Sequence, residues 1–174
     1  MGLTLYYTGF YTHFSFVLFI ISLMLPFTSP IKFFLLLNSI VVGFIGNLIH
    51  IKEFDTFVEY YRESDPTMTD EDIHYRINLG NFVSHTLPLF LSLVLLPFCK
   101  TQIKTKQDVI KFTIWEFGLF LVWSLLPFRN NIVQEKVDKS YPNTAFTMSM
   151  TLTFCIFFFA LLLFLGRGIN SIDD

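Results

Sequence analysis

Charge is scarce in this chain. Only 15% of its 174 residues are charged, whereas 53% are hydrophobic and 18% are aromatic. The net charge of −2 is uninformative, and no basic aromatic patch indicates nucleic acid, so we expect no nucleic-acid partner. This composition lies outside the usual range of soluble domains and indicates that lipid is the solvent for most of the chain.

The chain has only two cysteines and lacks the features of a cleaved signal peptide. The spacing of the two cysteines, Cys99 and Cys155, suggests no structural disulfide. The first apolar stretch lacks a preceding basic segment and a small-residue cleavage site, so we expect a retained helix. Because no change in composition marks a soluble domain, we expect residues 1–174 to form a single transmembrane domain.

Long apolar runs dominate what is present. Crossing a bilayer core of about 30 Å takes roughly 20 apolar residues of helix, and five stretches approach that length without Lys or Arg in their interiors. The runs are continuously apolar rather than alternating, which favours helices. We therefore predict an all-α integral membrane protein, a polytopic bundle of about five transmembrane helices. Their expected positions are about 9–27, 31–50, 78–98, 108–127 and 145–166.

The connection over residues 51–77 has a different pattern. Apolar residues recur at helical spacing in its first part, with charged residues on the other face, which predicts a helix over 51–64 lying in the membrane interface. The residues of this apolar face are Ile51, Phe54, Phe57, Val58 and Tyr61. Thr69 and Asp72 have the spacing of a capping box, which predicts a second short helix after them.

The positive charges indicate an orientation. The 12 Lys and Arg residues divide equally between the two sides, so their number alone does not decide. Their density does, because four lysines crowd one short loop, whereas the opposite loops are long and acidic. These lysines are Lys100, Lys104, Lys106 and Lys111. We place this basic loop and the C-terminus in the cytoplasm, with the N-terminus and residues 51–77 and 128–144 outside.

His85 and Glu116 are ionisable and lie well inside predicted spans, where such groups are costly and point to function. Most other polar residues in the spans are small or hydroxyl residues, which ordinarily serve helix packing. At 1.5 Å per residue, Thr12 and Ser15 lie at about the same depth as His85. If their helices touch, a hydroxyl nucleophile and an imidazole base are both present.

The segment Asn81-Phe-Val-Ser-His-Thr-Leu-Pro88 resembles a motif of the androgen-induced and androgen-dependent TFPI-regulating protein family. Members of that family are multi-spanning membrane enzymes that hydrolyse fatty acid esters of hydroxy fatty acids. The family's catalytic Thr lies in an aromatic-rich context near the start of an earlier helix, and Phe10-Tyr-Thr-His-Phe14 is similar. Tyr141-Pro142 and Trp123 also look like family features.

The resemblance implies a catalytic pair of Thr12 and His85, with Thr8 as the second candidate for the nucleophile. It also implies the orientation proposed above, with one departure, since the family usually has six helices and this chain would lack the helix before the threonine. A second departure is the spacer after Asn81, which is Phe-Val-Ser here and usually His-Gly-Met in the family.

We therefore expect a multi-pass membrane hydrolase of lipid esters, with a Thr nucleophile and a His base. Its partners would be membrane lipid and a lipid ester substrate, and the mechanism needs no cofactor and no metal. Two alternatives are a non-enzymatic membrane scaffold and a small transporter using Glu116 and His85 as a proton-linked pair. The full set of candidate site residues is Thr12 and His85, the alternative nucleophiles Thr8 and Ser15, and the supporting residues Asn81, Asn47 and Glu116.

Overall fold

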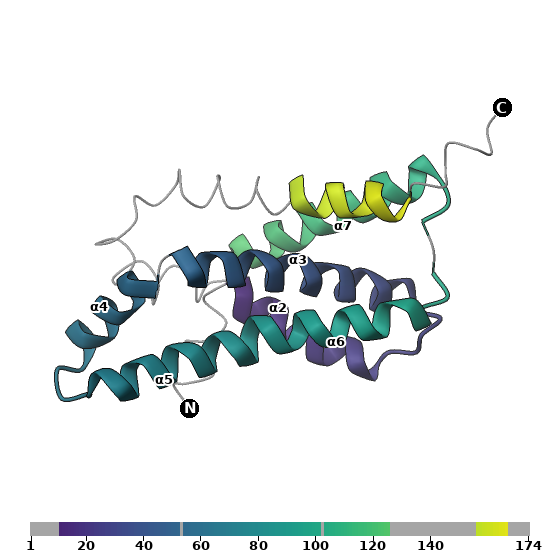
Figure 1. Cartoon of the computed structure of the whole chain (residues 1–174). Coiled ribbons are helices and arrows are strands. Elements are labelled where there is room, and N and C mark those ends of the chain that lie inside the picture. The colour runs from purple at the N-terminus through teal and green to yellow at the C-terminus, as the bar shows by residue number, and fades with distance from the viewer. Residues whose placement is uncertain (1–10, 53, 102, 126–155, 167–174) are drawn as a thin grey trace.

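The computed structural model of the chain describes residues 11–52, 54–101, 103–125 and 156–166. Within these ranges the secondary structure is entirely helical (Figure 1). Two helices, Pro30–Lys52 and Asp70–Phe98, are long and apolar enough to cross a membrane.

Helix α3 (Pro30–Lys52) is the central element of the bundle. It follows α2 (Tyr11–Met24) after a short turn, and the two helices run antiparallel (Figure 1). Every residue from 32 to 43 is buried, as expected of a helix that is apolar on all sides and packed within a bundle. The predicted helix over 31–50 is therefore confirmed, and α2 ends just before Pro26, whose ring cannot continue a helix.

The second long helix begins earlier than its apolar stretch suggests. It runs continuously over Asp70–Phe98 and comprises α5 (Asp70–Asn81), the π-helix η1 (Phe82–Thr86), α6 (Leu87–Leu95) and the 3₁₀ turn η2 (Leu96–Phe98). The sequence predicts a short helix after Thr69 and a membrane span from about residue 78, and the structure joins the two in one continuous helix. The cap at Thr69 is confirmed, since its hydroxyl accepts a hydrogen bond of 3.2 Å from the Asp72 amide. The Asp72 carboxylate accepts from the same hydroxyl at 2.7 Å.

Helix α4 (Phe54–Ser64) folds back onto α5. Val58, Ile73 and Ile77 form a small separate core, with Phe54, Phe57, Tyr61 and Met68 packed around it. Four of the five residues of the predicted apolar face thus pack on α5. Ile51 does not, because it belongs to α3 and is 76% exposed. Arg62 joins the same two helices by an ion pair of 2.8 Å to Asp70. In the connecting turn, hydrogen bonds from Thr67 lower the pKa of the Asp65 carboxyl.

Helix α7 (Lys106–Leu125) and a helix over Ile156–Leu165 complete the described structure. Phe112 of α7 lies against Phe33 and Phe34 of α3, with ring centroids 5.4 and 6.4 Å apart, and Phe34 also contacts Phe158 at 5.8 Å. The helix over Ile156–Leu165 falls within the predicted span 145–166, and α7 overlaps the predicted span 108–127 but begins two residues earlier, at Lys106. Residues 1–10, 126–155 and 167–174 lie outside the description, as do the parts of those spans that fall in them.

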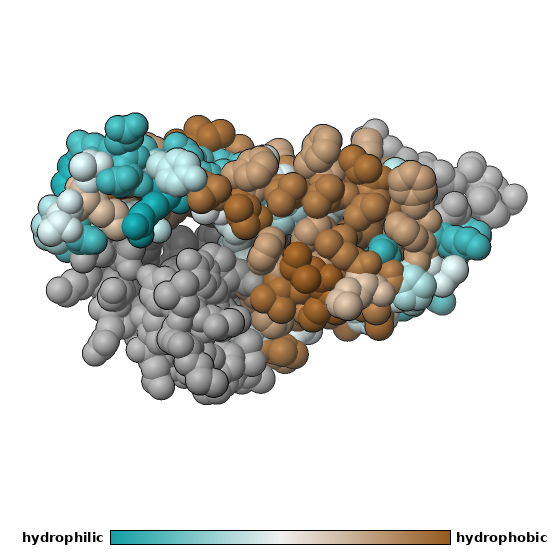
Figure 2. Space-filling model, turned by 90° about the horizontal axis from the view of Figure 1, so that it is seen from below, coloured by the Kyte–Doolittle hydropathy of each residue, from teal (hydrophilic) through white to brown (hydrophobic). Residues whose placement is uncertain are grey.

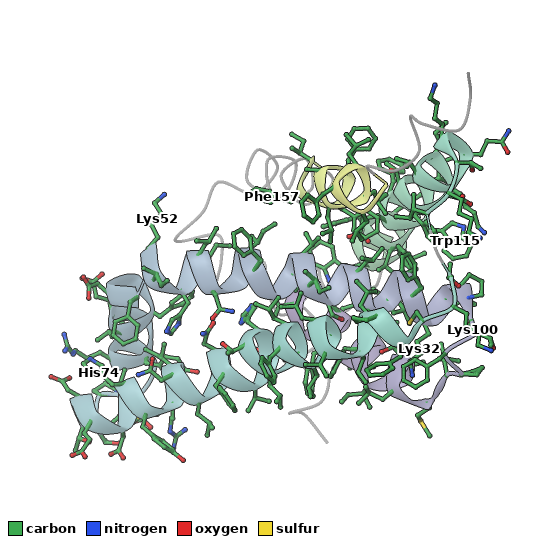
Figure 3. All side chains as sticks on the ribbon, turned by 45° about the vertical axis from the view of Figure 1, so that its right-hand side comes forward. Lys32, Lys52, His74, Lys100, Trp115 and Phe157 are labelled. Carbon is green, nitrogen blue, oxygen red and sulfur yellow. The ribbon has the colours of Figure 1, made fainter. Side chains whose placement is uncertain are left out.

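Polar side chains gather at the two ends of the molecule. Figure 2 shows a hydrophilic region over α4 and the start of α5, a brown apolar zone over the middle, and hydrophilic residues again at the opposite end. Lys52 and His74 mark one end, and Lys32 and Lys100 mark the other (Figure 3). Apolar side chains on the middle surface, such as Phe90 at 63% exposure, suit contact with lipid rather than with water.

Ile73→Ala tests the small core between α4 and α5. The side chain is fully buried, so its truncation should cost about 2–5 kcal/mol and loosen α4 from α5. Hydrogen exchange of the α4 amides in detergent micelles should speed up, while the amides of α3 keep their protection. Tyr75→Ala on the exposed side of α5 is the matched control and should leave α4 unchanged.

Candidate active site

The candidate site lies where α3 and the long helix approach most closely. Two glycines on one face of α3 permit this approach. A Cβ atom at Gly46 would lie 1.7 Å from Cδ2 of His85, and one at Gly43 would lie 2.6 Å from the His85 carbonyl oxygen. The imidazole ring therefore rests directly on the Gly46 backbone, as in membrane helix pairs that pack through small residues.

His85 itself belongs to the π-helical turn η1. This turn directly precedes Pro88, which has no N–H to donate to the carbonyl of Ser84 in an α-helical pattern. The Leu87 amide donates instead to the Phe82 carbonyl, five residues back. Such π turns accommodate an extra residue and are frequent at functional sites. Here the turn sets the direction in which the imidazole leaves the helix.

Both ring nitrogens of His85 have hydroxyl neighbours. Nε2 lies 3.3 Å from Oγ1 of Thr12 on α2, and Nδ1 lies 3.2 Å from Oγ of Ser84. The Ser84 hydroxyl is also 2.5 Å from the Gly80 carbonyl oxygen. The structure thus brings together the two residues predicted as nucleophile and base, across a separation of 73 residues.

The two supporting amides form a network between α3 and the long helix. Asn47 donates to the Gly43 carbonyl at 2.7 Å and accepts hydrogen bonds from Asn81 at 3.0 Å and from Thr86 at 2.9 Å. A carbonyl oxygen only accepts, so the first bond fixes the orientation of Asn47, and Asn47 in turn fixes that of Asn81. Both amides thereby hold the backbone of η1 against α3. Their proposed role as oxyanion donors stays a prediction.

The remaining candidates have different places. Ser15 follows Thr12 by one turn of α2, and its buried hydroxyl has no hydrogen-bond partner in the described part of the chain. Thr8 lies outside the described residues. Glu116 is fully buried on α7, one helical turn after Phe112 and hence beside the aromatic interface with α3. Among the described hydroxyls proposed as nucleophile, Thr12 has a hydrogen bond to the histidine.

This geometry matches the general arrangement of an activated hydroxyl. A nucleophile within hydrogen-bond reach of an imidazole, which a third group orients, is the common pattern of Ser/Thr hydrolases. Within the described residues no group of three His, Cys, Asp or Glu side chains could hold a metal ion. Sequence reasoning did not select Ser84 as a site residue, although its place beside His85 and four residues after Gly80 was a usable signal.

Apolar side chains surround the approach to the histidine. Phe82 and Val83, in the same π turn, are 51% and 39% exposed, and His85 and Thr12 are each partly exposed. A molecule dissolved in lipid would therefore meet an apolar surface before it met the hydroxyl.

The chain has no match among protein-family models, curated proteins or solved structures. The family resemblance thus rests on sequence features alone, chiefly residues 81–88, and stays a prediction.

Gly46→Ala tests the contact between the glycine and the imidazole. The added methyl group would overlap the ring, so the helices must separate or His85 must turn away, and overpacking of this kind typically costs about 1–3 kcal/mol. The midpoint of thermal unfolding in detergent should fall. Gly80→Ala is the matched control, because nothing lies within 4 Å of its Cβ position and alanine favours helix by about 1 kcal/mol. Equal effects of both variants would contradict the close packing at Gly46.

Proposed function

We propose that this protein is a multi-pass membrane hydrolase of lipid esters, of the fatty acid ester of hydroxy fatty acid type. The observation that carries this proposal is the 3.3 Å contact between Nε2 of His85 and Oγ1 of Thr12. It is supported by the resemblance of residues 81–88 to the family motif and by the apolar surroundings of the pair.

In the proposed reaction, Nε2 takes the hydroxyl proton as Oγ1 attacks the ester carbonyl carbon. The tetrahedral intermediate collapses, the bond from carbon to the alkoxy oxygen breaks, and the imidazolium returns the proton to the leaving alcohol. A water molecule then attacks the acyl-threonine while Nε2 takes its proton. Collapse releases the fatty acid, and the proton returns to Thr12.

The membrane setting of the proposal is a bundle of about five spans. Two described helices have the length for crossing, and polar groups gather at both ends of the molecule (Figure 2). The basic loop around Lys104 would face the cytoplasm, and the α4–α5 hairpin with its acidic first turns would face outside. Ester and fatty acid products would exchange with the surrounding lipid beside Phe82 and Val83.

Thr12→Ala and His85→Ala test the catalytic pair. Each should abolish labelling by a fluorophosphonate probe and hydrolysis of a hydroxy-fatty-acid ester in micelles, because an unassisted threonine hydroxyl is a poor nucleophile at neutral pH. The double variant should lose little more than either single one, since the two residues act as a unit. Expression and membrane insertion should remain at the level of the unchanged protein.

The control for this experiment is Ser92→Ala, which removes a buried hydroxyl on α6 and should cost little activity. Loss of labelling in Thr8→Ala but not in Thr12→Ala would assign the nucleophile to Thr8 instead. Full activity of His85→Ala would end the hydrolase proposal. Absence of labelling combined with pH-dependent flux in liposomes would favour the transporter, and absence of both would favour the scaffold.

The proposed orientation is tested with single cysteines introduced into a chain in which Cys99 and Cys155 are replaced by alanine. Thr67→Cys, in the turn between α4 and α5, should react with an impermeant maleimide added outside intact cells. Lys104→Cys should react only after the membrane is permeabilised. The reverse pattern would show the opposite orientation, and labelling of both in intact cells would contradict a bundle with its two ends on opposite sides.

A further inference from the structure

The hydrogen bonds around His85 define where its protons lie. The Gly80 carbonyl oxygen can only accept a hydrogen bond, and it lies 2.5 Å from Oγ of Ser84. Ser84 has one hydroxyl proton, so that proton is donated to Gly80. The serine oxygen is then left with lone pairs only, and its second contact, with Nδ1 of His85 at 3.2 Å, requires the proton to be on the histidine nitrogen.

This assignment fixes the other ring nitrogen. A neutral imidazole with a proton on Nδ1 has a lone pair on Nε2, and Nε2 faces the Thr12 hydroxyl at 3.3 Å. The chain of donors therefore runs from Thr12 to His85, from His85 to Ser84, and from Ser84 to the Gly80 carbonyl. In the opposite tautomer Nε2 would carry the proton and could not accept the one on Thr12.

We propose that Ser84 is a positioning residue that holds His85 in the tautomer with a proton on Nδ1, so that Nε2 can act as the base toward Thr12. This inference rests on the proposed hydrolase function and extends it to a third residue. Ser84 touches neither the nucleophile nor the substrate in this mechanism, and it acts through the imidazole.

The π turn explains how adjacent residues can cooperate in this way. In a regular α-helix, neighbouring side chains point in different directions and do not face each other. A π turn has more residues per turn, so successive side chains diverge less. Pro88 favours this turn, and the turn brings the Ser84 hydroxyl to the same side as the imidazole of the next residue.

The experiment measures tautomer and activity in the same set of proteins. The chain is prepared with ¹⁵N-labelled histidine in micelles, and the ring signals of His85 are identified by their loss in His85→Gln. The unchanged protein should show a protonated Nδ1. Ser84→Ala removes the acceptor, so the population with a protonated Nε2 should rise and ester hydrolysis should fall by about 10- to 100-fold, as for other residues that orient a functional histidine.

Two variants separate positioning from folding. Ser84→Thr keeps a hydroxyl that can donate to the Gly80 carbonyl, so it should restore both the tautomer and hydrolysis. Ser39→Ala is the matched control, because Ser39 makes the same kind of bond to the carbonyl four residues back, at 2.8 Å to Leu35. It should leave the His85 signals and the rate unchanged.

The outcomes distinguish this proposal from the hydrolase proposal. A protonated Nε2 in the unchanged protein overturns the role of Ser84, and that measurement does not depend on whether Ser84→Ala folds. An unchanged rate in Ser84→Ala overturns it as well. If Ser84→Ala shifts the tautomer but the unchanged protein hydrolyses no ester, the hydrolase proposal fails while the orienting bond stands.

Discussion

The close approach of α3 to the long helix is the constraint on which the candidate site depends. His85 has room for its ring only because Gly46 has no side chain, since a Cβ there would lie 1.7 Å from the ring. The same approach places Asn47 within hydrogen-bond distance of Asn81 and Thr86. In lipid, polar groups of this kind must find partners within the protein. The glycines and the amide network therefore act together. The glycines allow the two helices to approach closely, and the hydrogen bonds of the amides stabilise that approach.

A break in one helix then turns this contact into a site. Pro88 interrupts the α-helical hydrogen bonding just after His85. The backbone forms a π turn at this point. Breaks of this kind are tolerated in membrane helices where neighbouring protein covers them, and α3 provides that cover. The imidazole consequently points to Thr12 on α2.

Much of the fold could be predicted from the sequence, because apolar runs and caps are local signals. The helix of α3 and the cap at Thr69 follow from them, whereas α2 ends at Met24, before the expected end near residue 27. The continuity of the long helix was missed because residues 70–77 begin with three acidic residues and bury only Ile73 and Ile77, so the sequence indicates a separate short helix there. Their packing against α4 is a tertiary contact, and the apolar length of the stretch does not reveal it.

The site was predictable to a similar degree. Depth along the helices indicated that Thr12 and His85 lie at one level, and the structure places them 3.3 Å apart. Ser84 was missed because we assumed a regular α-helix, in which the side chains of adjacent residues do not face each other. Pro88 was the only local sign that the direction changes there. Glu116 is ionisable and buried as expected. Its location beside α3 results from the aromatic packing of α7 against that helix.

The proposed hydrogen-bond relay from Thr12 through His85 and Ser84 to the Gly80 carbonyl contains no carboxylate. A soluble hydrolase commonly orients its histidine with a buried carboxylate, but an ion in a lipid-covered site carries a large desolvation cost. In our proposal the acceptor is the Ser84 hydroxyl, which lies 2.5 Å from the Gly80 carbonyl oxygen, and neither of these groups carries a charge. Such a relay orients the imidazole without a buried anion, but it stabilises the imidazolium less than a carboxylate would. If Thr12 and His85 are the catalytic pair, slower chemistry is the expected consequence of placing them within the membrane.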